Sequence, residues 1–180
     1  MFLRSASPDL RGNEKKYLID AIDEEEISSQ GRFVREFESS FADFCDARHA
    51  VSTSNGTTAL HLALLAAGIK EGDEVIVPAP YWVSYPDVVL FAGGTPVFVA
   101  AGPEQGYKLR PEQLEAAITP RTKWVILNSP SNPTGATLSA EELKSLAETC
   151  SSKGVKFINY YPVCISKVFA FSYSWFIYIR

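Results

Sequence analysis

The chain has 180 residues, 46% of them hydrophobic, and its 17 basic and 21 acidic side chains give a formal net charge of −4. This length and apolar content suffice for one ordinary hydrophobic core, and an acidic balance without a basic cluster argues against a nucleic-acid-binding surface. Cys45, Cys150 and Cys164 are far apart and form no CxxC pair, which argues against a zinc site and a disulfide framework. Residues 1–16 contain no apolar signal-peptide core, so we expect a cytoplasmic protein. We also expect that the protein binds no metal ion.

The first 48 residues are predicted to form an N-terminal helical segment. Residues 12–29 place apolar side chains near helical spacing, at Tyr17, Leu18, Ile22 and Ile27. Residues 33–44 repeat apolar side chains in the pattern of an amphipathic helix, at positions 33, 34, 37, 41 and 44.

From residue 49 onward, predicted strands alternate with predicted helices. The strands are expected at 49–53, 73–80, 95–100, 122–129 and 155–159. The helices are expected at 54–69, at 81–94 with a stop at Gly93 and Gly94, at 110–119, and at 139–154 with a Ser139–Glu142 capping box and a stop at Gly154. Because the strands are apolar throughout, they indicate a parallel sheet covered on both faces, and we predict an α/β domain over residues 49–160.

Functional sites in such sheets lie at the carboxyl ends of the strands. The turn 54–58, within "SNGTTALHLAL", carries Gly56, Thr57 and Thr58 at the start of a helix. The unpaired N–H groups and the dipole of a helix N-terminus attract anions, so this turn is a candidate phosphate site. An ordinary N-cap is the alternative, since Ser, Asn and Thr are the usual capping residues, and no GKS or GKT follows as in a P-loop.

Two further turns, 78–82 and 128–135, carry an aromatic pair and an asparagine between prolines. Tyr81 and Trp82 either pack in the core or line a cleft, where a planar heteroaromatic ligand could stack. The side-chain NH₂ of Asn132 can donate to a phenolate-type oxygen, although Asn-Pro is also common in plain turns. Together the three turns offer a phosphate site, a stacking ring and a polar donor, which are the requirements of pyridoxal 5′-phosphate.

The motifs resemble two families of aminotransferases. "GDEVIVP", "PYWVSYPDVVLFAGGTPVFV" and "LEAAITPRTKWVILNSPSNPTGATLSAEELKSLAE" make residues 72–148 similar to class I enzymes of the bacterial aspartate/prephenate type. "GNEKKYLIDAIDEEEISSQGRFVREFESSFADF" and "AVSTSNGTTALHLALLAAGIKEGDEVIVP" make residues 10–78 resemble the DegT/DnrJ/EryC1/StrS sugar aminotransferases. Both families have the type I pyridoxal-phosphate fold, with a mixed seven-stranded sheet in a large domain, and form homodimers. Their chains are about twice this length, so the resemblance implies part of the large domain, with an incomplete sheet and no small domain.

The resemblance also implies roles for individual residues. Gly56, Thr57 and Thr58 would hold the cofactor phosphate, Trp82 would stack on the pyridine ring, and Asn132 would donate to the phenolic oxygen. The peptide bonds Ala79–Pro80 and Asn132–Pro133 would be cis, as in class I relatives.

Two groups that the cofactor chemistry needs are doubtful or missing. Class I enzymes place an Asp against the pyridine nitrogen and a tyrosine three residues later, but Tyr160 and Val163 stand at the matching positions, and no acidic residue follows Glu148. Lys167, in "ISKVFAFSYSW", matches the segment that carries the catalytic lysine, although it is about thirty residues too close to Asn132. The alternative is that Lys167 belongs to an unrelated tail.

The hydrophobic stretch 161–180 has no clear place in this pattern. It is too short and too polar for a membrane span, which leaves a core strand or an aberrant segment from a frameshift or unspliced message, and we favour the latter.

The predicted function is transfer of an amino group from an aspartate-like amino acid to a 2-oxo acid, with little or no turnover in this chain. Its partners would be these small molecules, with neither nucleic acid nor membrane. A sugar-nucleotide aminotransferase and a non-catalytic fragment are the alternatives.

Overall fold

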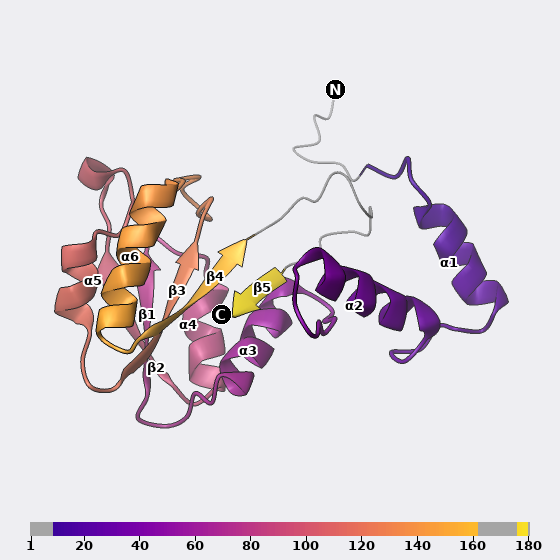
Figure 1. Ribbon diagram of the computed structural model, residues 1–180, viewed down its shortest axis with the longest axis horizontal. Coiled ribbons are helices and arrows are strands. Elements are labelled where there is room, and N and C mark those ends of the chain that lie inside the picture. Colours follow the sequence, from indigo (N-terminus) through magenta and orange to yellow (C-terminus); the bar gives the residue numbers. More distant parts are fainter. Residues whose placement is uncertain (1–8, 162–175, 180) are drawn as a thin grey trace. The chain divides into compact units, whose positions relative to one another are not determined.

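The computed structural model describes residues 9–161 and 176–179 (Figure 1). These residues belong to two compact units. The first comprises described residues 9–54, and the second comprises 55–161 together with 176–179.

The first unit contains the two helices that the sequence predicts, α1 (Glu14–Asp23) and α2 (Arg32–Phe44). Aromatic side chains join them, with the rings of Tyr17 and Phe33 5.6 Å apart. Helix α1 ends earlier than predicted, because Glu25 adopts a left-handed conformation (φ 57°) and the N–H of Glu26 donates to the carbonyl of Ala21. Ile27, expected inside the helix, therefore lies beyond it and is exposed.

The strand predicted at 49–53 is not formed, so that prediction was wrong. A strand is stabilised by pairing with a neighbour, and no described strand pairs with this segment. Instead, the N–H and the hydroxyl of Ser52 donate to Glu38 Oε1 on α2, at 2.7 and 2.9 Å.

The second unit alternates helices and strands as predicted. Its helices are α3 (Gly56–Ala66), α4 (Ser84–Phe91), α5 (Pro111–Ala117) and α6 (Ala140–Ser152), with a short 3₁₀ helix, η1 (Pro103–Gln105). Its strands are β1 (Glu74–Ala79), β2 (Thr95–Ala100), β3 (Thr122–Asn128), β4 (Lys156–Tyr161) and β5 (Phe176–Ile179). Helix α4 begins three residues later than predicted, which leaves Tyr81 and Trp82 in the turn after β1.

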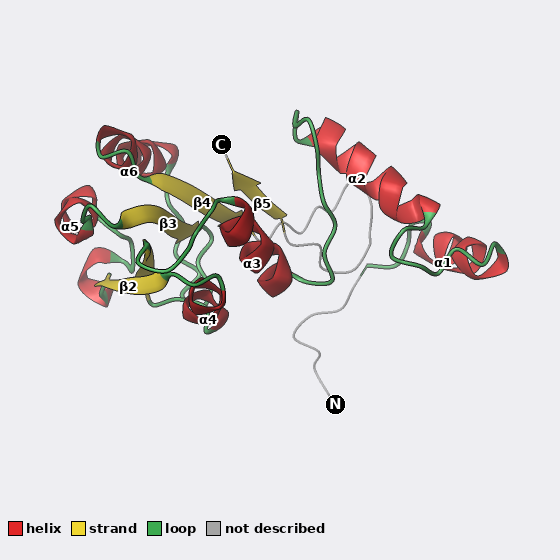
Figure 2. Ribbon diagram, turned by 90° about the horizontal axis from the view of Figure 1, so that it is seen from below, coloured by secondary structure: helices red, strands yellow, loops and turns green. Residues whose placement is uncertain are grey.

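The strands form one five-stranded sheet in the order β2-β1-β3-β4-β5 (Figure 2). Strands β1 to β4 run parallel, which confirms the parallel α/β sheet, and β5 pairs antiparallel with β4. Strand β5 comes from the hydrophobic stretch 161–180, whose residues 162–175 and 180 lie outside the described part of the chain.

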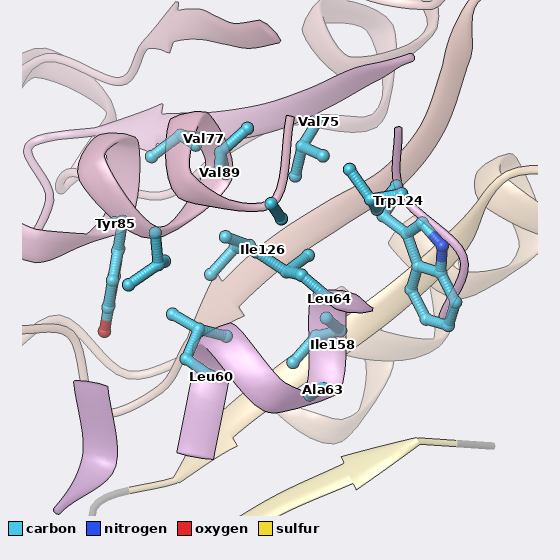
Figure 3. Close-up of a cluster of buried hydrophobic side chains, with 13 residues drawn as sticks. Leu60, Ala63, Leu64, Val75, Val77, Tyr85, Val89, Trp124, Ile126 and Ile158 are labelled. Atoms are coloured by element: carbon cyan, nitrogen blue, oxygen red, sulfur yellow. The ribbon is translucent and has the colours of Figure 1, made fainter. Parts of the chain in front are cut away.

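Helices cover both faces of the sheet, and alternate strand residues divide between two cores. Val75, Val77 and Ile126 pack with Leu60 and Leu64 of α3 in one cluster, which also contains residues of α4 (Figure 3). Ile76, Val125 and Leu127 point to the other face, where they pack with Leu114 of α5 and Leu146 of α6. This two-sided burial explains why the strands are apolar throughout.

The amino ends of β1 and β3 hold a buried carboxylate. Glu74 is only 4% exposed, and it accepts hydrogen bonds from the hydroxyl of Thr119 at 2.6 Å, the hydroxyl of Thr122 at 3.2 Å and Nε of Arg121 at 2.9 Å. These donors, Thr119 first and Arg121 next, hold the pKa of Glu74 below its ordinary value of 4.5. The cluster ties two neighbouring strands together at the end of the sheet opposite the predicted site.

The structure confirms the helix signals that are local in sequence. Ser139 and Glu142 form the predicted capping box: the N–H of Glu142 donates to Ser139 Oγ, and the N–H of Ser139 donates to Glu142 Oε2. Helix α4 stops at Gly93, which adopts φ 88° while the N–H of Gly94 donates to the carbonyl of Val89.

Candidate functional site

Two of the three predicted turns meet at the carboxyl edge of the sheet. Strands β1 and β3 are parallel neighbours, so the turns that follow them, 78–82 and 128–135, lie next to each other. A small pocket between them is lined by Pro78–Tyr81 from the first turn and by Asn128, Ser131 and Asn132 from the second. The structure thus brings Asn132 to the predicted edge.

The start of the 128–135 turn is held by its own hydrogen bonds. The N–H of Asn132 donates to Asn128 Oδ1 at 2.7 Å. The N–H of Gly135 donates to the carbonyl of Ser131 at 2.7 Å, and the N–H of Ser131 donates to the carbonyl of Ala136 at 2.8 Å. Gly135 adopts φ 74°, which a residue with a side chain rarely takes.

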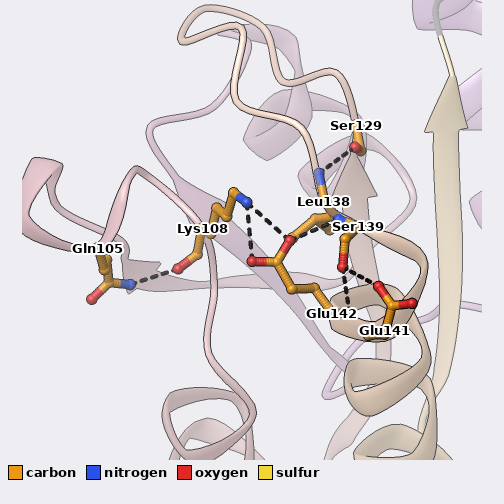
Figure 4. Close-up of polar contacts among 7 residues, drawn as sticks. All are labelled: Gln105, Lys108, Ser129, Leu138, Ser139, Glu141 and Glu142. Carbon is orange, nitrogen blue, oxygen red and sulfur yellow. Dashed lines mark hydrogen bonds and ion pairs between the residues drawn. The ribbon is translucent and has the colours of Figure 1, made fainter.

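The far end of the turn is anchored to the strand that precedes it. The N–H of Leu138 donates to Ser129 Oγ at 2.9 Å (Figure 4). Ser129 is 2% exposed, so this hydroxyl satisfies a backbone group where little water is available. The turn is therefore a closed and braced loop.

Both predicted cis peptide bonds are present, at Ala79–Pro80 and Asn132–Pro133. Ser129–Pro130 is cis as well.

The sequence left open whether Tyr81 and Trp82 pack in the core or line a cleft, and the structure gives a different answer for each residue. The ring of Tyr81 is stacked on Phe98 at 5.2 Å and packs against the core. Trp82 is 43% exposed, and its carbonyl accepts from the N–H of Tyr85 at the start of α4. A ring surface is therefore available for stacking on a ligand at Trp82, and the stacking itself stays a prediction.

In the turn 54–58, two residues cap the N-terminus of α3. Asn55 is the N-cap of α3, and its Oδ1 accepts the N–H of Thr58 at 3.0 Å. The hydroxyl of Thr58 donates to the carbonyl of Asn55 at 2.8 Å, so the N-cap alternative is confirmed for this pair. Gly56 and Thr57 also belong to the first turn, whose N–H groups have no intrahelical acceptor.

Helix α3 directs its N-terminal half toward the carboxyl edge of the sheet. In Figure 3, Leu60 lies toward Tyr85, which follows the carboxyl end of β1, whereas Leu64 lies nearer Trp124, close to the start of β3. Gly56 and Thr57 precede Leu60, so they lie at the end of α3 that faces this edge. They do not line the pocket that contains Asn132, and neither does Trp82.

Two residues that sequence reasoning missed, Tyr107 and Lys108, also line the pocket. Lys108 Nζ lies 3.0 and 2.9 Å from the two carboxylate oxygens of Glu142 (Figure 4). The N–H of Ser139, followed by Lys108, lowers the pKa of Glu142. The partners are 34 residues apart, and no local pattern in the sequence predicts such a pair.

The described residues fit one part of pyridoxal phosphate and lack another. The N–H groups of the first turn of α3, the exposed Trp82 indole and the side-chain amide of Asn132 are of the kinds that would bind a phosphate, a ring face and a phenolic oxygen. No residue of β4 is acidic, and the backbone of Tyr160 pairs in register with Asn128, so this strand brings no carboxylate to the edge. Val163 and Lys167 lie outside the described residues.

Three further features of the described part of the chain concern metal ligands, membrane spans and a cysteine thiol. Over residues 9–161 and 176–179, no group of three or more His, Cys, Asp and Glu side chains could hold a metal ion. None of the described helices is long and apolar enough to cross a membrane. Burial raises the pKa of the Cys150 thiol to about 11, which keeps that thiol protonated and unreactive at neutral pH.

Comparison with known proteins identifies the family of the chain. Residues 8–160 match the model of the DegT/DnrJ/EryC1/StrS aminotransferase family. An aspartate/prephenate aminotransferase of Cereibacter sphaeroides is 55% identical over 137 residues, which cover 76% of this chain and 33% of the relative. A GDP-perosamine synthase of Caulobacter vibrioides is 50% identical over 121 residues, 67% of this chain and 32% of the relative.

Solved structures show the same fold. A single mutant of Thermus thermophilus aspartate aminotransferase superposes with a TM-score of 0.69 and 34% identity, covering 89% of this chain and 44% of that one. An aspartate aminotransferase from Rhizobium meliloti gives a TM-score of 0.64 and 34% identity, over 86% of this chain and 42% of that one. The second unit is thus part of the large domain of a type I aminotransferase, and the chain spans about a third of the length of the curated relatives it matches.

Proposed function

The chain belongs to the DegT/DnrJ/EryC1/StrS aminotransferase family, and on this premise we propose that its second unit forms part of a pyridoxal-phosphate site for amino-group transfer. The observation that carries the proposal is the fixed position of Asn132, which a braced turn presents at the carboxyl edge of the sheet.

The residues of the chain have separate tasks in this proposal. The N–H groups of Gly56 and Thr57 bind the phosphate, where the dipole of the eleven-residue α3 favours an anion. The exposed face of Trp82 orients the ring by offset stacking. The NH₂ of Asn132 donates to the phenolic oxygen. The cofactor, when bound, supplies the electron sink that amino transfer requires.

The substrates that fit best are an aspartate-like amino acid and a 2-oxo acid. The Asn132-Pro-Thr-Gly turn and Trp82 support this choice, because both belong to the part of the chain that resembles the aspartate/prephenate enzymes. Transfer to a keto sugar nucleotide is the second candidate, and the similarity to a GDP-perosamine synthase favours it.

Turnover in this chain is proposed to be low. The pyridine nitrogen needs a carboxylate to stay protonated, and β4 has Tyr160 where such a group would stand. A non-catalytic, cofactor-holding fragment is therefore the alternative that this sequence supports.

Borohydride reduction tests the proposal. The purified chain is titrated with pyridoxal phosphate, reduced, digested and mapped by mass spectrometry. Saturable binding with one reduced adduct at Lys167 supports an aminotransferase, and assays with aspartate then follow. Saturable binding without a specific adduct supports the cofactor-holding fragment. A chain that does not bind the cofactor contradicts both.

A further inference from the structure

We propose that Asn128 is a positioning residue: its side-chain oxygen fixes the backbone of Asn132 and so sets the direction in which the Asn132 amide is presented. The inference rests on the proposed function, in which that amide binds the cofactor ring. It assigns a task to a residue that itself touches neither phosphate nor ring in the proposal.

Asn128 is well placed to act as a fixed point. It is the last residue of β3, a strand paired on both sides, and its own backbone is in register with Tyr160 of β4. Its Oδ1 lies 2.7 Å from the amide nitrogen of Asn132, a short and therefore well-formed hydrogen bond. Both asparagines are half-buried and line the same pocket.

The turn leaves Asn132 dependent on a side-chain acceptor. Neighbouring acceptors serve other donors: the carbonyl of Ser131 accepts from the N–H of Gly135, and Ser129 Oγ accepts from the N–H of Leu138. The acceptor for the N–H of Asn132 is Asn128 Oδ1, which reaches back across four residues. A backbone held at its nitrogen also holds its Cα–Cβ bond, and with it the origin of the side-chain amide.

Two substitutions test whether the side-chain oxygen of Asn128, rather than the size of the side chain, holds the N–H of Asn132. Asn128→Asp keeps an oxygen that can accept from the N–H of Asn132. Asn128→Leu has the same branching at Cγ but no acceptor, so that N–H loses its partner in a half-buried place. Functional groups lose affinity when the residues that orient them are removed, even though the groups themselves are intact.

A variant at the other end of the same strand controls for lost stability. Thr122 donates a buried hydrogen bond to Glu74 at the amino end of β3. Thr122→Ala therefore weakens the strand without altering the turn after Asn128.

The test measures pyridoxal-phosphate affinity by equilibrium dialysis and hydrogen exchange at the Asn132 amide by NMR, in wild type and the three variants. We expect Asn128→Leu to bind about tenfold more weakly, the equivalent of one hydrogen bond, with Asn128→Asp within about threefold of wild type. The Asn132 amide should exchange faster in Asn128→Leu alone. Thr122→Ala should lower the thermal midpoint and leave affinity and exchange unchanged.

The outcomes distinguish this inference from the proposed function. If wild type binds the cofactor and Asn128→Leu binds it equally well, the positioning role is overturned and the proposed function stands. If Asn128→Asp weakens binding as much as Asn128→Leu, acceptance by Oδ1 is not what matters, and the inference also fails. A wild type that does not bind overturns the proposed function, and the inference that rests on it.

Discussion

The backbone N–H of Asn132 donates to the side-chain oxygen of Asn128, 2.7 Å away, so a residue in the turn after β3 is held by the last residue of that strand. The bond reaches across the cis Ser129–Pro130 peptide, and the cis Asn132–Pro133 peptide follows Asn132 directly. The relationship makes Asn132 a fixed feature of the sheet edge, and the predictions below concern the groups arranged around it.

Asn132→Ala should weaken cofactor retention far more than it weakens folding. The substitution removes only the side-chain amide and keeps the N–H that bonds to Asn128. We expect pyridoxal-phosphate affinity to fall about tenfold, for one lost hydrogen bond, and the free energy of unfolding to change by less than about 0.5 kcal/mol. Equilibrium dialysis and urea denaturation provide the two measurements. Equal losses in both would show that the turn is only a connector.

Trp82→Ala should reduce affinity for pyridoxal phosphate while leaving stability nearly unchanged. The indole is 43% exposed, and a lost stacking contact is worth about 1 kcal/mol, or about fivefold in affinity. Trp82→Phe keeps an aromatic face and should recover most of that loss. Phe91→Ala, at a more exposed ring on α4, is the matched control and should not affect binding. Equal effects of Trp82→Ala and Phe91→Ala would argue against a ring-stacking role.

Thr57→Ala should mainly affect phosphate binding and Thr58→Ala should mainly affect stability, because only Thr58 takes part in the capping box. Thr58→Ala should lower the free energy of unfolding by about 1 kcal/mol, because its hydroxyl loses the hydrogen bonds with Asn55 that form half of the capping box. Thr57→Ala should leave stability within about 0.5 kcal/mol and weaken phosphate binding severalfold. Paired denaturation and binding titrations check this. A Thr58→Ala variant that loses affinity at unchanged stability would mean that its hydroxyl serves the ligand.

Stability should fall in acid through Glu74. Its pKa in the folded chain is below 4.5, so its contribution is complete above that pH and is lost as the pH falls through the folded value. Glu74→Gln should lower the free energy of unfolding by about 2 kcal/mol at neutral pH, since charge-assisted hydrogen bonds are lost. The difference between variant and wild type should shrink below pH 4.5. Urea denaturation from pH 7 to pH 3 measures it, and a constant difference would exclude Glu74 as the acid-sensitive group.

Much of the second unit could be predicted from local patterns. Helix ends followed their signals: Ser139 and Glu142 cap α6, and Gly93 and Gly94 end α4. The apolar strands predicted the two-sided burial of the sheet, and the resemblance to class I relatives implied the two cis bonds. These features depend on a few neighbouring residues, which is why a single sequence is enough to recognise them.

The errors have a common physical cause. The segment 49–53 has the composition of a strand, yet no described strand pairs with it, and a strand forms only where a partner strand is available. Tyr81 and Trp82 were assigned to a helix that begins only at Ser84. A partner strand for 49–53 and the ring of Phe98, on which Tyr81 stacks, both lie outside the local window.

The sequence by itself determined the class of fold, the family and the position of Asn132 at a strand end, because hydrophobic periodicity and sequence motifs depend only on residues that are close together in the chain. Only the tertiary structure decided what surrounds that position: the bond from Asn128, the hydroxyl of Ser129 under Leu138, and the pair of Lys108 with Glu142. The first two contacts join a side chain to the backbone of a turn, and the third joins two side chains that are 34 residues apart. Their distances depend on how the whole sheet packs.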